Sequence, residues 1–291
     1  MVAGEPRLLP RAGNGAVILA KMDSALYPSS QQSDVAVDRY LAISVDDGSA
    51  QDSRTAELLQ KYGLQATFYV PASNPERPVM APSEIREVAK QFEIGSHTLS
   101  HLPINRMSAA HASREIKEGK SWLEDVLGER VISFCYPRGK FNRTTPALVR
   151  DAGFLGARTT MMNLCDFPEN PFLWGVSTQA YSHSKFIQVR HALLEHNFAG
   201  MRNFFRDFHG VTDWQQHFTY ALESVKKHGG IAHLILHSWE VEELGSWNML
   251  EAVFESVSRR GLTSITNGDL YRLWSASKVE PQAIAEHVQS K

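Results

Sequence analysis

The strongest constraint on the fold of this chain is the regular alternation of strand-like and helix-like segments over about 230 residues. Apolar runs such as residues 40–45 are followed by amphipathic segments such as residues 109–127, and glycine or proline separates them. Strands that alternate with helices along a chain form a parallel sheet covered by helices. The pattern predicts a parallel α/β fold, and by itself it leaves a barrel and a doubly wound sheet open.

Eight helices and seven strands with definite bounds are expected from this pattern, together with one further strand and a loop between about residue 163 and the helix at 184–197. The strands are expected at 40–45, 66–70, 92–94, 131–135, 156–159, 231–237 and 262–265, and the helices at 52–62, 82–90, 109–127, 146–152, 184–197, 213–228, 248–259 and 268–274. We find neither an internal repeat nor a low-complexity linker, so we predict one domain over residues 37–275. An irregular lead-in over 1–36 would precede it, and a peripheral polar tail over 276–291 would follow it.

Composition excludes several classes of protein. The formal net charge is −2, which gives no electrostatic footprint for nucleic acid or an anionic membrane. No stretch approaches the roughly 20 apolar residues of a membrane span, and residues 1–28 do not resemble a signal peptide. Cys135 and Cys165 cannot form a disulfide framework. These features predict a cytoplasmic protein.

Three polar clusters directly follow predicted strands: Asp46 with Asp47, His97 with His101, and His237. In a parallel α/β fold the loops at the carboxyl ends of the strands converge on one face, so these clusters are expected to meet. Adjacent aspartates on an extended segment point in different directions, so one carboxylate can bind a metal while the other accepts a proton. The alternative for a lone Asp-Asp-Gly is a helix N-cap followed by a turn.

Two histidine pairs have a four-residue spacing, and context separates them. His97 and His101 follow a strand end and could share one side of a helical turn. His233 and His237 lie on one apolar strand, where four residues span about 13 Å, so they are not expected to share a metal. Two histidines and a carboxylate, with one position left for water, form a catalytic metal set. His237 is a candidate acid for the leaving amine of an amide, and its alternative is a core histidine bonded to a carbonyl.

These residues resemble the motifs of the polysaccharide deacetylase family, the NodB-homology domain. Residues 44–48 (SVDDG) resemble its first motif, residues 96–101 (SHTLSH) match its histidine motif, residues 66–70 (ATFYV) resemble its second strand, and residues 234–237 (LILH) resemble its last motif. The similarity extends over about residues 40–270, and the order and spacing of the motifs agree.

The resemblance implies a distorted (β/α) barrel with about seven parallel strands. It implies that Asp46 is the general base, that Asp47, His97 and His101 bind the metal, and that His237 is the general acid. Leu236 or Leu234 would line the pocket for the acetyl methyl group. The implied cofactor is one divalent metal ion, with zinc favoured over cobalt, nickel or manganese.

Two segments depart from the family pattern. The third motif is replaced by residues 134–142 (FCYPRGKFN), where Arg138 is expected to orient the base and Tyr136 to line the groove. Asp166 and Trp174 are candidates for the fourth motif. Trp239 is a candidate platform for a sugar ring, although a tryptophan in the core is the alternative.

The predicted function is removal of an N-acetyl or N-formyl group from an amino sugar or a saccharide precursor. An amidohydrolase for small or cyclic amides is the alternative within the same superfamily, and a non-catalytic carbohydrate-binding domain is the alternative from another class. A two-metal phosphoesterase would need more bridging carboxylates than this chain aligns. The expected partner is an N-acylated saccharide or a small amide, with no nucleic acid and no membrane span.

Overall fold

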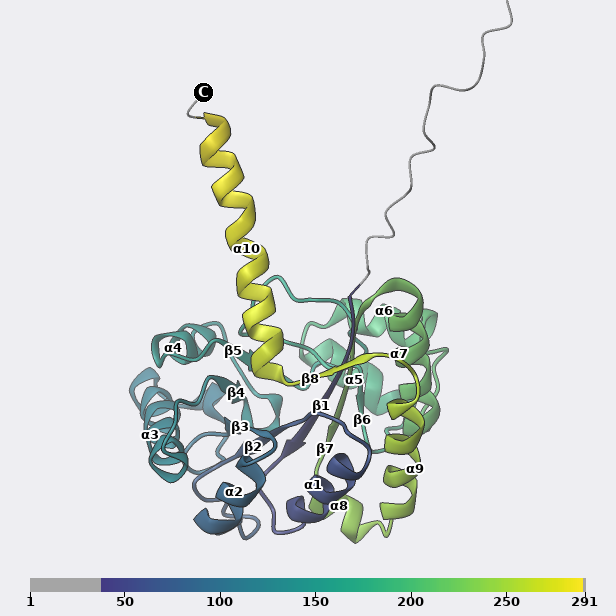
Figure 1. The fold of residues 1–291 in the computed structure, drawn as a ribbon, viewed down its shortest axis with the longest axis horizontal. Coiled ribbons are helices and arrows are strands. Elements are labelled where there is room, and N and C mark those ends of the chain that lie inside the picture. The colour runs from purple at the N-terminus through teal and green to yellow at the C-terminus, as the bar shows by residue number, and fades with distance from the viewer. Residues whose placement is uncertain (1–37, 290–291) are drawn as a thin grey trace, which may run out of the picture. The chain divides into compact units, whose positions relative to one another are not determined.

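One mixed α/β unit with a curved parallel sheet accounts for residues 38–289, which the computed structural model describes, with side chains through Lys278 (Figure 1). The predicted lead-in over 1–36 lies outside these residues. The strands are β1 (Arg39–Asp46), β2 (Thr67–Val70), β3 (Glu93–Ser96), β4 (Ser133–Cys135), β5 (Gly156–Arg158), β6 (Thr178–Gln179), β7 (Gly230–Leu236) and β8 (Thr263–Ile265).

Ten α-helices and two 3-10 turns connect the strands within the described range. The helices are α1 (Asp52–Lys61), α2 (Pro82–Ala89), α3 (Ala109–Leu127), α4 (Thr145–Asp151), α5 (Lys185–Leu194), α6 (Phe198–Arg206), α7 (Trp214–His228), α8 (Ser238–Glu243), α9 (Trp247–Ser258) and α10 (Asn267–Gln289), and the 3-10 turns are η1 (Ile104–Arg106) and η2 (Pro137–Gly139). No helix in this range is both long enough and apolar enough to cross a membrane.

The sheet confirms the predicted fold class. Seven parallel strands lie in the order β5-β4-β3-β2-β1-β7-β6, and the short β8 pairs with β1 outside this path. The segment 174–179 pairs first with β5, through Trp174 and Arg158, and then with β7 through β6. It therefore links the two sides of the sheet in place of a regular strand, which makes the barrel a distorted one.

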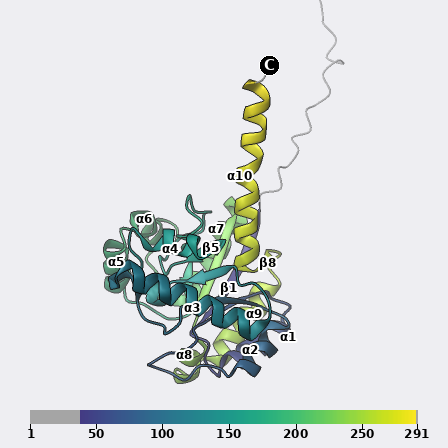
Figure 2. The same ribbon diagram turned by 90° about the vertical axis from the view of Figure 1, so that its left-hand side faces the viewer.

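The core explains why β1 lies at the centre. Six consecutive side chains of β1, from Leu41 to Asp46, are buried, because helices cover one face of the strand and side chains of other strands cover the opposite face. Figure 1 shows β1 between β2 and β7, and Figures 1 and 2 show helices around the outside of the sheet. The carboxyl end of β1 is thereby fixed at the middle of one face of the molecule, and it carries Asp46.

Two expected helix boundaries were wrong. The single helix expected over 184–197 is interrupted, because His196 has a left-handed backbone (φ 53°) and the Asn197 side chain accepts a hydrogen bond from the Gly200 N–H to begin α6. The last helix continues beyond the expected end at Trp274, and past the predicted domain boundary at 275, to Gln289. Both differences concern helix ends, where local propensity is a weak guide.

Candidate functional site

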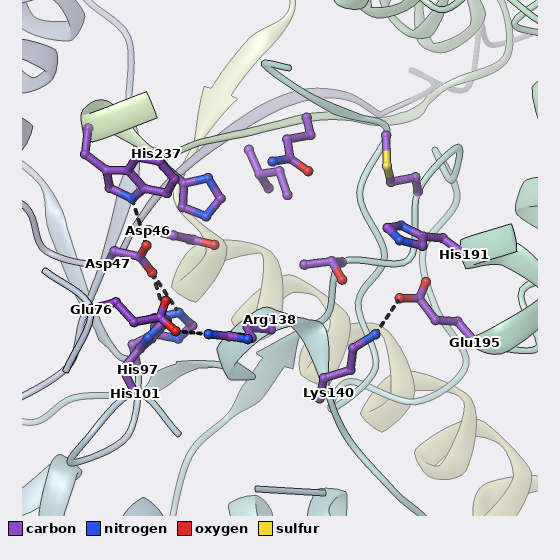
Figure 3. A pocket seen from close by; sticks show the side chains of 15 residues that line it. Asp46, Asp47, Glu76, His97, His101, Arg138, Lys140, His191, Glu195 and His237 are labelled. Carbon is purple, nitrogen blue, oxygen red and sulfur yellow. Dashed lines mark hydrogen bonds and ion pairs between the residues drawn. The ribbon is translucent and has the colours of Figure 1, made fainter. Parts of the chain in front are cut away.

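A cavity of about 370 Å³ opens at the carboxyl edge of the sheet, where β1, β3 and β7 end (Figure 3). Its walls are mostly polar. The lining residues are Asp46, Asp47, Glu76, His97, His101, Arg138, Lys140, Thr160, Met162, Gln179, His191, Glu195, Ile235, His237 and Trp239. The five residues that the sequence placed at strand ends (Asp46, Asp47, His97, His101 and His237) are therefore together in one cavity, as expected from parallel strands.

Three of these side chains converge on one point. Asp47 Oδ1 lies 3.0 Å from His101 Nε2 and 3.6 Å from His97 Nε2, and all three residues are buried. One ligand atom of each residue lies within 4.8 Å of the others. Asp47 (φ 79°) and His101 (φ 55°) adopt left-handed backbone conformations, which are unfavourable for residues other than glycine and concentrate at functional sites. The geometry suits a small ion held by three protein ligands.

The surroundings hold these groups in the states that a metal requires. The Nδ1 of His97 lies 2.8 Å from the carbonyl oxygen of Cys135, so a proton there leaves the Nε2 lone pair facing the site. Burial lowers the pKa of His97 and favours its neutral form. Burial acts to raise the pKa of Asp47, but hydrogen bonds to His101 and His97 outweigh it and hold that pKa well below its usual range.

The two histidines meet in a loop, and the predicted helical turn is wrong. Residues 97–101 follow β3 without a helix, and Thr98 (φ 72°) turns the chain so that the two imidazole rings lie 4.9 Å apart. Glu115 of α3 anchors this loop, because its carboxylate accepts hydrogen bonds from the Ser100 N–H (2.9 Å) and hydroxyl (2.7 Å). The other two histidines with a four-residue spacing, His233 and His237, do not meet. His233 points away from the site, and its Nε2 lies 2.7 Å from the Ser44 hydroxyl.

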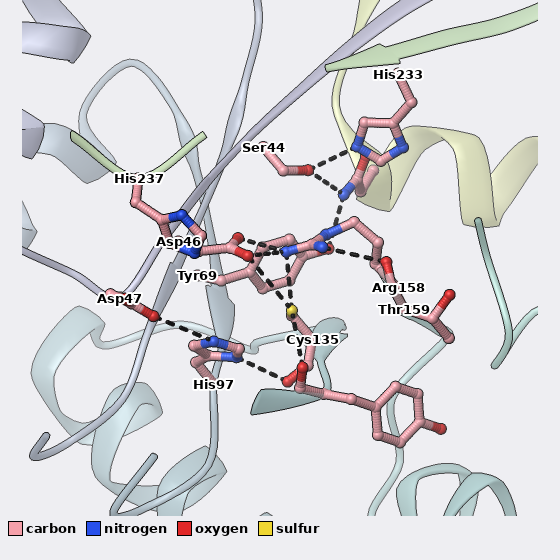
Figure 4. Close-up of polar contacts among 12 residues, drawn as sticks. Ser44, Asp46, Asp47, Tyr69, His97, Cys135, Arg158, Thr159, His233 and His237 are labelled. Atoms are coloured by element: carbon pink, nitrogen blue, oxygen red, sulfur yellow. Dashed lines mark hydrogen bonds and ion pairs between the residues drawn. The ribbon is translucent and has the colours of Figure 1, made fainter. Parts of the chain in front are cut away.

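Asp46 is held by an arginine that the sequence analysis did not identify. The fully buried Arg158, from β5, donates from Nη2 to both carboxylate oxygens of Asp46, and also contacts Cys135 Sγ at 2.9 Å (Figure 4). Arg138, which was expected to orient Asp46, is half exposed and pairs with Glu76. That expectation was wrong, because Arg138 lies in η2 with a left-handed backbone (φ 56°) and its side chain meets Glu76 instead.

His237 has an acidic partner on the next helix turn. Its Nδ1 lies 3.4 Å from Glu240 Oε2, which leaves Nε2 as its unpaired ring nitrogen. Burial acts to lower the pKa of His237, but the hydrogen bond with Glu240 and the negative charges of Asp47 and Asp46 raise it to about 9. The imidazole therefore carries a proton at neutral pH, as a general acid must.

Of the three residues predicted to bind substrate, Trp239 lines the cavity, whereas Leu236 and Tyr136 are buried in the core. Leu236 is buried in the core and Ile235 lines the cavity instead, because successive side chains of β7 point to opposite faces. Tyr136 is also buried, and its hydroxyl donates to the carbonyl oxygen of Phe172 at 3.1 Å. Trp239 does line the cavity. Its Nε1 donates to Asp47 Oδ2 at 2.9 Å, and the Arg77 guanidinium covers its ring at 3.5 Å.

Neither candidate for the fourth motif reaches the site. Trp174 is buried, its backbone forms an isolated β-bridge with that of Arg158, and its ring packs on Tyr271. Asp166 borders a separate cavity near Arg206. The acidic partner of His237 is Glu240, which follows it by three residues. Because a helix begins at Ser238, this spacing brings the two side chains together, so the sequence contained a signal for the pair. Arg158 had only the weaker signal of a charged residue in a strand of small residues.

The far end of the cavity contains a second polar group. Lys140 Nζ lies 3.7 Å from Glu195 Oε1, and His191 lines the cavity beside them (Figure 3). Burial raises the pKa of Glu195 to about 7, against the opposing charge of Lys140. His191 lies on α5, and Glu195 is the residue that follows this helix. The segment between β6 and α7, which carried no motif, therefore forms one wall of the site.

Comparison with known proteins agrees with this geometry. The polysaccharide deacetylase family model matches residues 34–157. The peptidoglycan-N-acetylglucosamine deacetylase of Bacillus cereus is 28% identical over 120 residues, which cover 40% of this chain and 54% of that protein. The peptidoglycan-N-acetylmuramic acid deacetylase of Bacillus subtilis is 28% identical over 106 residues, which cover 36% of this chain and 22% of that protein. The matched region spans about half or less of these relatives.

Solved structures show the same fold at lower sequence identity. The Xyl-CE4 domain of a multidomain xylanase from the hindgut metagenome of Trinervitermes trinervoides has a TM-score of 0.53 at 19% identity, covering 82% of this chain and 92% of that one. A family 4 acetyl xylan esterase from Clostridium thermocellum, solved with a cobalt ion, has a TM-score of 0.52 at 18% identity, covering 81% of this chain and 91% of that one.

Proposed function

We propose that this chain, which carries a polysaccharide deacetylase domain of the NodB-homology type, is a metal-dependent hydrolase that removes the N-acetyl group of an amino sugar. The observation that carries the proposal is the convergence of Asp47, His97 and His101 in one cavity with Asp46 and His237. The family match and the named activities of the relatives support the choice of an N-acetylated saccharide.

Asp47, His97 and His101 would hold the metal ion. Two imidazoles and one carboxylate suit zinc, and the same ligands also accept cobalt, nickel or manganese. The bound ion would polarise the acyl carbonyl and acidify a water molecule beside it. Trp239 holds the second oxygen of Asp47, and the Cys135 carbonyl fixes the ring of His97, so both ligands are already oriented.

The remaining residues move protons. Asp46 accepts a proton from the attacking water, and Arg158 keeps its carboxylate in place from the buried side. His237 donates a proton to the departing nitrogen, because an unprotonated amide anion is a poor leaving group, and Glu240 supports the charged imidazole. Each role requires the residue to reach the same substrate, and all of these groups except the supporting Arg158 and Glu240 line the cavity.

The cavity fits a saccharide unit better than an extended apolar ligand. Its volume of about 370 Å³ is near the lower end of the range for small-molecule sites. Two ion pairs, Arg138 with Glu76 and Lys140 with Glu195, border it and offer hydrogen-bond partners for sugar hydroxyls. Ile235 provides an apolar wall for a methyl group.

Metal content and hydrolysis of an N-acetylglucosamine oligomer test the proposal. We expect one divalent ion in the wild type, loss of the ion in His97→Ala, and retained ion with turnover lowered by about 10²- to 10⁴-fold in Asp46→Asn. The exposed His111→Ala is the matched control and keeps both metal and activity. A wild type that takes up no metal contradicts the site assignment. A metal-loaded wild type that ignores the oligomer but hydrolyses small amides contradicts the choice of substrate.

A further inference from the structure

The helix pair α5 and α6 exposes an unusual concentration of apolar side chains. Among the residues that the structure describes, twelve large hydrophobic side chains are exposed, and six of them lie on these two helices. Their exposed fractions range from 36% to 75%. These six residues, called here the apolar face, are Phe186, Ile187, Leu193, Leu194, Phe198 and Phe205. A cluster of this density marks an interaction surface, whereas isolated exposed residues would need no explanation.

The helix α5 buries few of its apolar side chains, and only Gln188 and Ala192 of its residues are buried. By contrast, Phe186 is 75% exposed. A helix on a soluble protein normally turns its apolar side to the core. The inner side of α6 buries Phe204 in the core, and beside it Asn203 Nδ2 donates to the Asn163 carbonyl at 3.0 Å. The outward position of these apolar side chains is therefore a property of the fold.

Each helix carries an exposed arginine among its apolar residues. On α5, Phe186 and Leu193 flank Arg190 at spacings of four and three residues, which places all three on one face. On α6, Phe198 and Phe205 flank Arg202 at the same spacings. In the described structure neither arginine forms a salt bridge. The segment 185–207 holds four lysines and arginines and two acidic residues, of which Asp207 pairs with Arg206, so the segment carries an excess of two positive charges although the whole chain has a net charge of −2.

The two faces belong to one surface. A β-carbon placed on Gly210 would lie 3.6 Å from Lys185 Nζ and 3.8 Å from Phe205 Cδ1, so the beginning of α5 meets the end of α6. The helices contact each other along their length and lie side by side in Figures 1 and 2. The pair is thus an antiparallel hairpin that offers apolar and cationic side chains together.

We infer that the apolar face of α5 and α6, with Arg190 and Arg202, binds the surface of a lipid bilayer that contains anionic lipids. Phenylalanine and leucine side chains can enter the boundary between headgroups and acyl chains, while arginines pair with the negative headgroups. A second copy of this chain is disfavoured as the occupant, because the two cationic faces would repel each other. The low net charge of the whole chain conceals this local positive charge.

The apolar face lies beside the cavity. His191 lines the cavity and follows Ile187 by four residues and precedes Leu194 by three, so it lies at the edge of the apolar face. Glu195, the residue after the helix, also lines the cavity. An α-helix with side chains is about 10–12 Å across. A bilayer bound to α5 would hold the cavity within about one helix diameter of the lipid surface, where a saccharide carried by that surface would reach it.

Sedimentation of the full-length, metal-loaded chain with lipid vesicles tests the inference. We expect strong binding to vesicles that contain phosphatidylglycerol, weak binding to phosphatidylcholine alone, and loss of binding as salt rises. Arg190→Glu with Arg202→Glu should weaken binding by at least about 25-fold, since each arginine contributes about fivefold. Arg114→Glu with Arg259→Glu changes the net charge equally at exposed sites elsewhere, and should retain most of the binding.

A second pair of double variants tests how much the apolar side chains contribute to vesicle binding. Leu193→Ala with Leu194→Ala should weaken binding by about tenfold. Leu244→Ala with Leu273→Ala removes leucines of similar exposure elsewhere, one directly after α8 and one on α10, and should leave binding unchanged. Circular dichroism melting confirms that all variants fold. Wild type that fails to bind anionic vesicles, equal losses in both leucine pairs, or a stable dimer abolished by Leu193→Ala with Leu194→Ala would each overturn the inference. None of these readouts depends on amide hydrolysis.

Discussion

At the scale of single residues, the site depends on buried charges that compensate each other. Arg158 is fully buried and its partner Asp46 nearly so, and their pairing fixes the carboxylate that is proposed to act as base. Removing one partner leaves an uncompensated charge in the interior, which is far less favourable than removing both. The pair is thus expected to affect stability and turnover together.

Arg158→Met should lower the free energy of unfolding by about 3–5 kcal/mol, because Asp46 loses the buried cation that pairs with it. The double variant Asp46→Asn with Arg158→Met should lose clearly less than the sum of the two single variants. Denaturant unfolding of the four proteins without metal measures this coupling. Additive losses, within about 0.5 kcal/mol, would show that the two side chains do not depend on each other.

At the scale of elements, the loop that is proposed to bind the metal is shaped by the helix behind it. Gly119 lies inside α3 where this helix approaches residues 98–99. A β-carbon at Gly119 would lie 2.5 Å from the Thr98 carbonyl carbon and 2.6 Å from the Leu99 nitrogen, which is closer than atoms can approach. The glycine therefore allows close contact between α3 and the loop that presents His97 and His101.

Gly119→Ala should weaken metal binding even though alanine favours a helix by about 1 kcal/mol. The methyl group must push the 97–101 loop outward and separate the histidines from Asp47. Isothermal titration with zinc measures the effect, and Lys117→Ala, at an exposed position of the same helix, is the control. A Gly119→Ala protein that is more stable and binds zinc as the wild type does would show that the loop can move without consequence.

At the scale of the whole molecule, His217 joins separate parts of the chain. Its Nδ1 lies 2.8 Å from the Thr178 hydroxyl of β6, and its Nε2 lies 2.8 Å from Asn163 Oδ1 in the loop after β5. Its ring stacks on Phe208 at 4.3 Å. Burial, with a smaller effect from His183, lowers the pKa of His217 to about 4. The folded protein therefore holds this imidazole in its neutral form.

The lowered pKa predicts a loss of stability in acid. The unfolded chain binds a proton near pH 6.5 and the folded chain only near pH 4, so the contribution is fully present above pH 6.5 and is lost as the pH falls toward 4. The total loss is up to about 3 kcal/mol. The free energy of unfolding, measured with denaturant between these pH values, should change less steeply with pH for His217→Gln than for the wild type. His111→Gln should keep the wild-type slope. Equal slopes for His217→Gln and the wild type would contradict the prediction.

The sequence alone determined the fold class and which motif residues meet. Asp46, Asp47, His97, His101 and His237 directly follow strands, and the carboxyl ends of parallel strands share one face whatever the details of packing. Most of the helices and strands were likewise encoded locally, in apolar periodicity and in glycine and proline positions, although α6 and α8 were not expected. These features depend on neighbours along the chain, so they are visible without coordinates.

Only the tertiary structure decided which side chains support the motif residues. Arg158 rather than Arg138 reaches Asp46, and Ile235 rather than Leu236 lines the cavity. The direction of a strand side chain changes with every residue, and its partner is set by register against another strand. The outward apolar side of α5 was also invisible, because a helix pattern shows that one side differs from the other without showing which side meets the core. Such choices depend on contacts between segments far apart in the sequence, and those exist only in the folded chain.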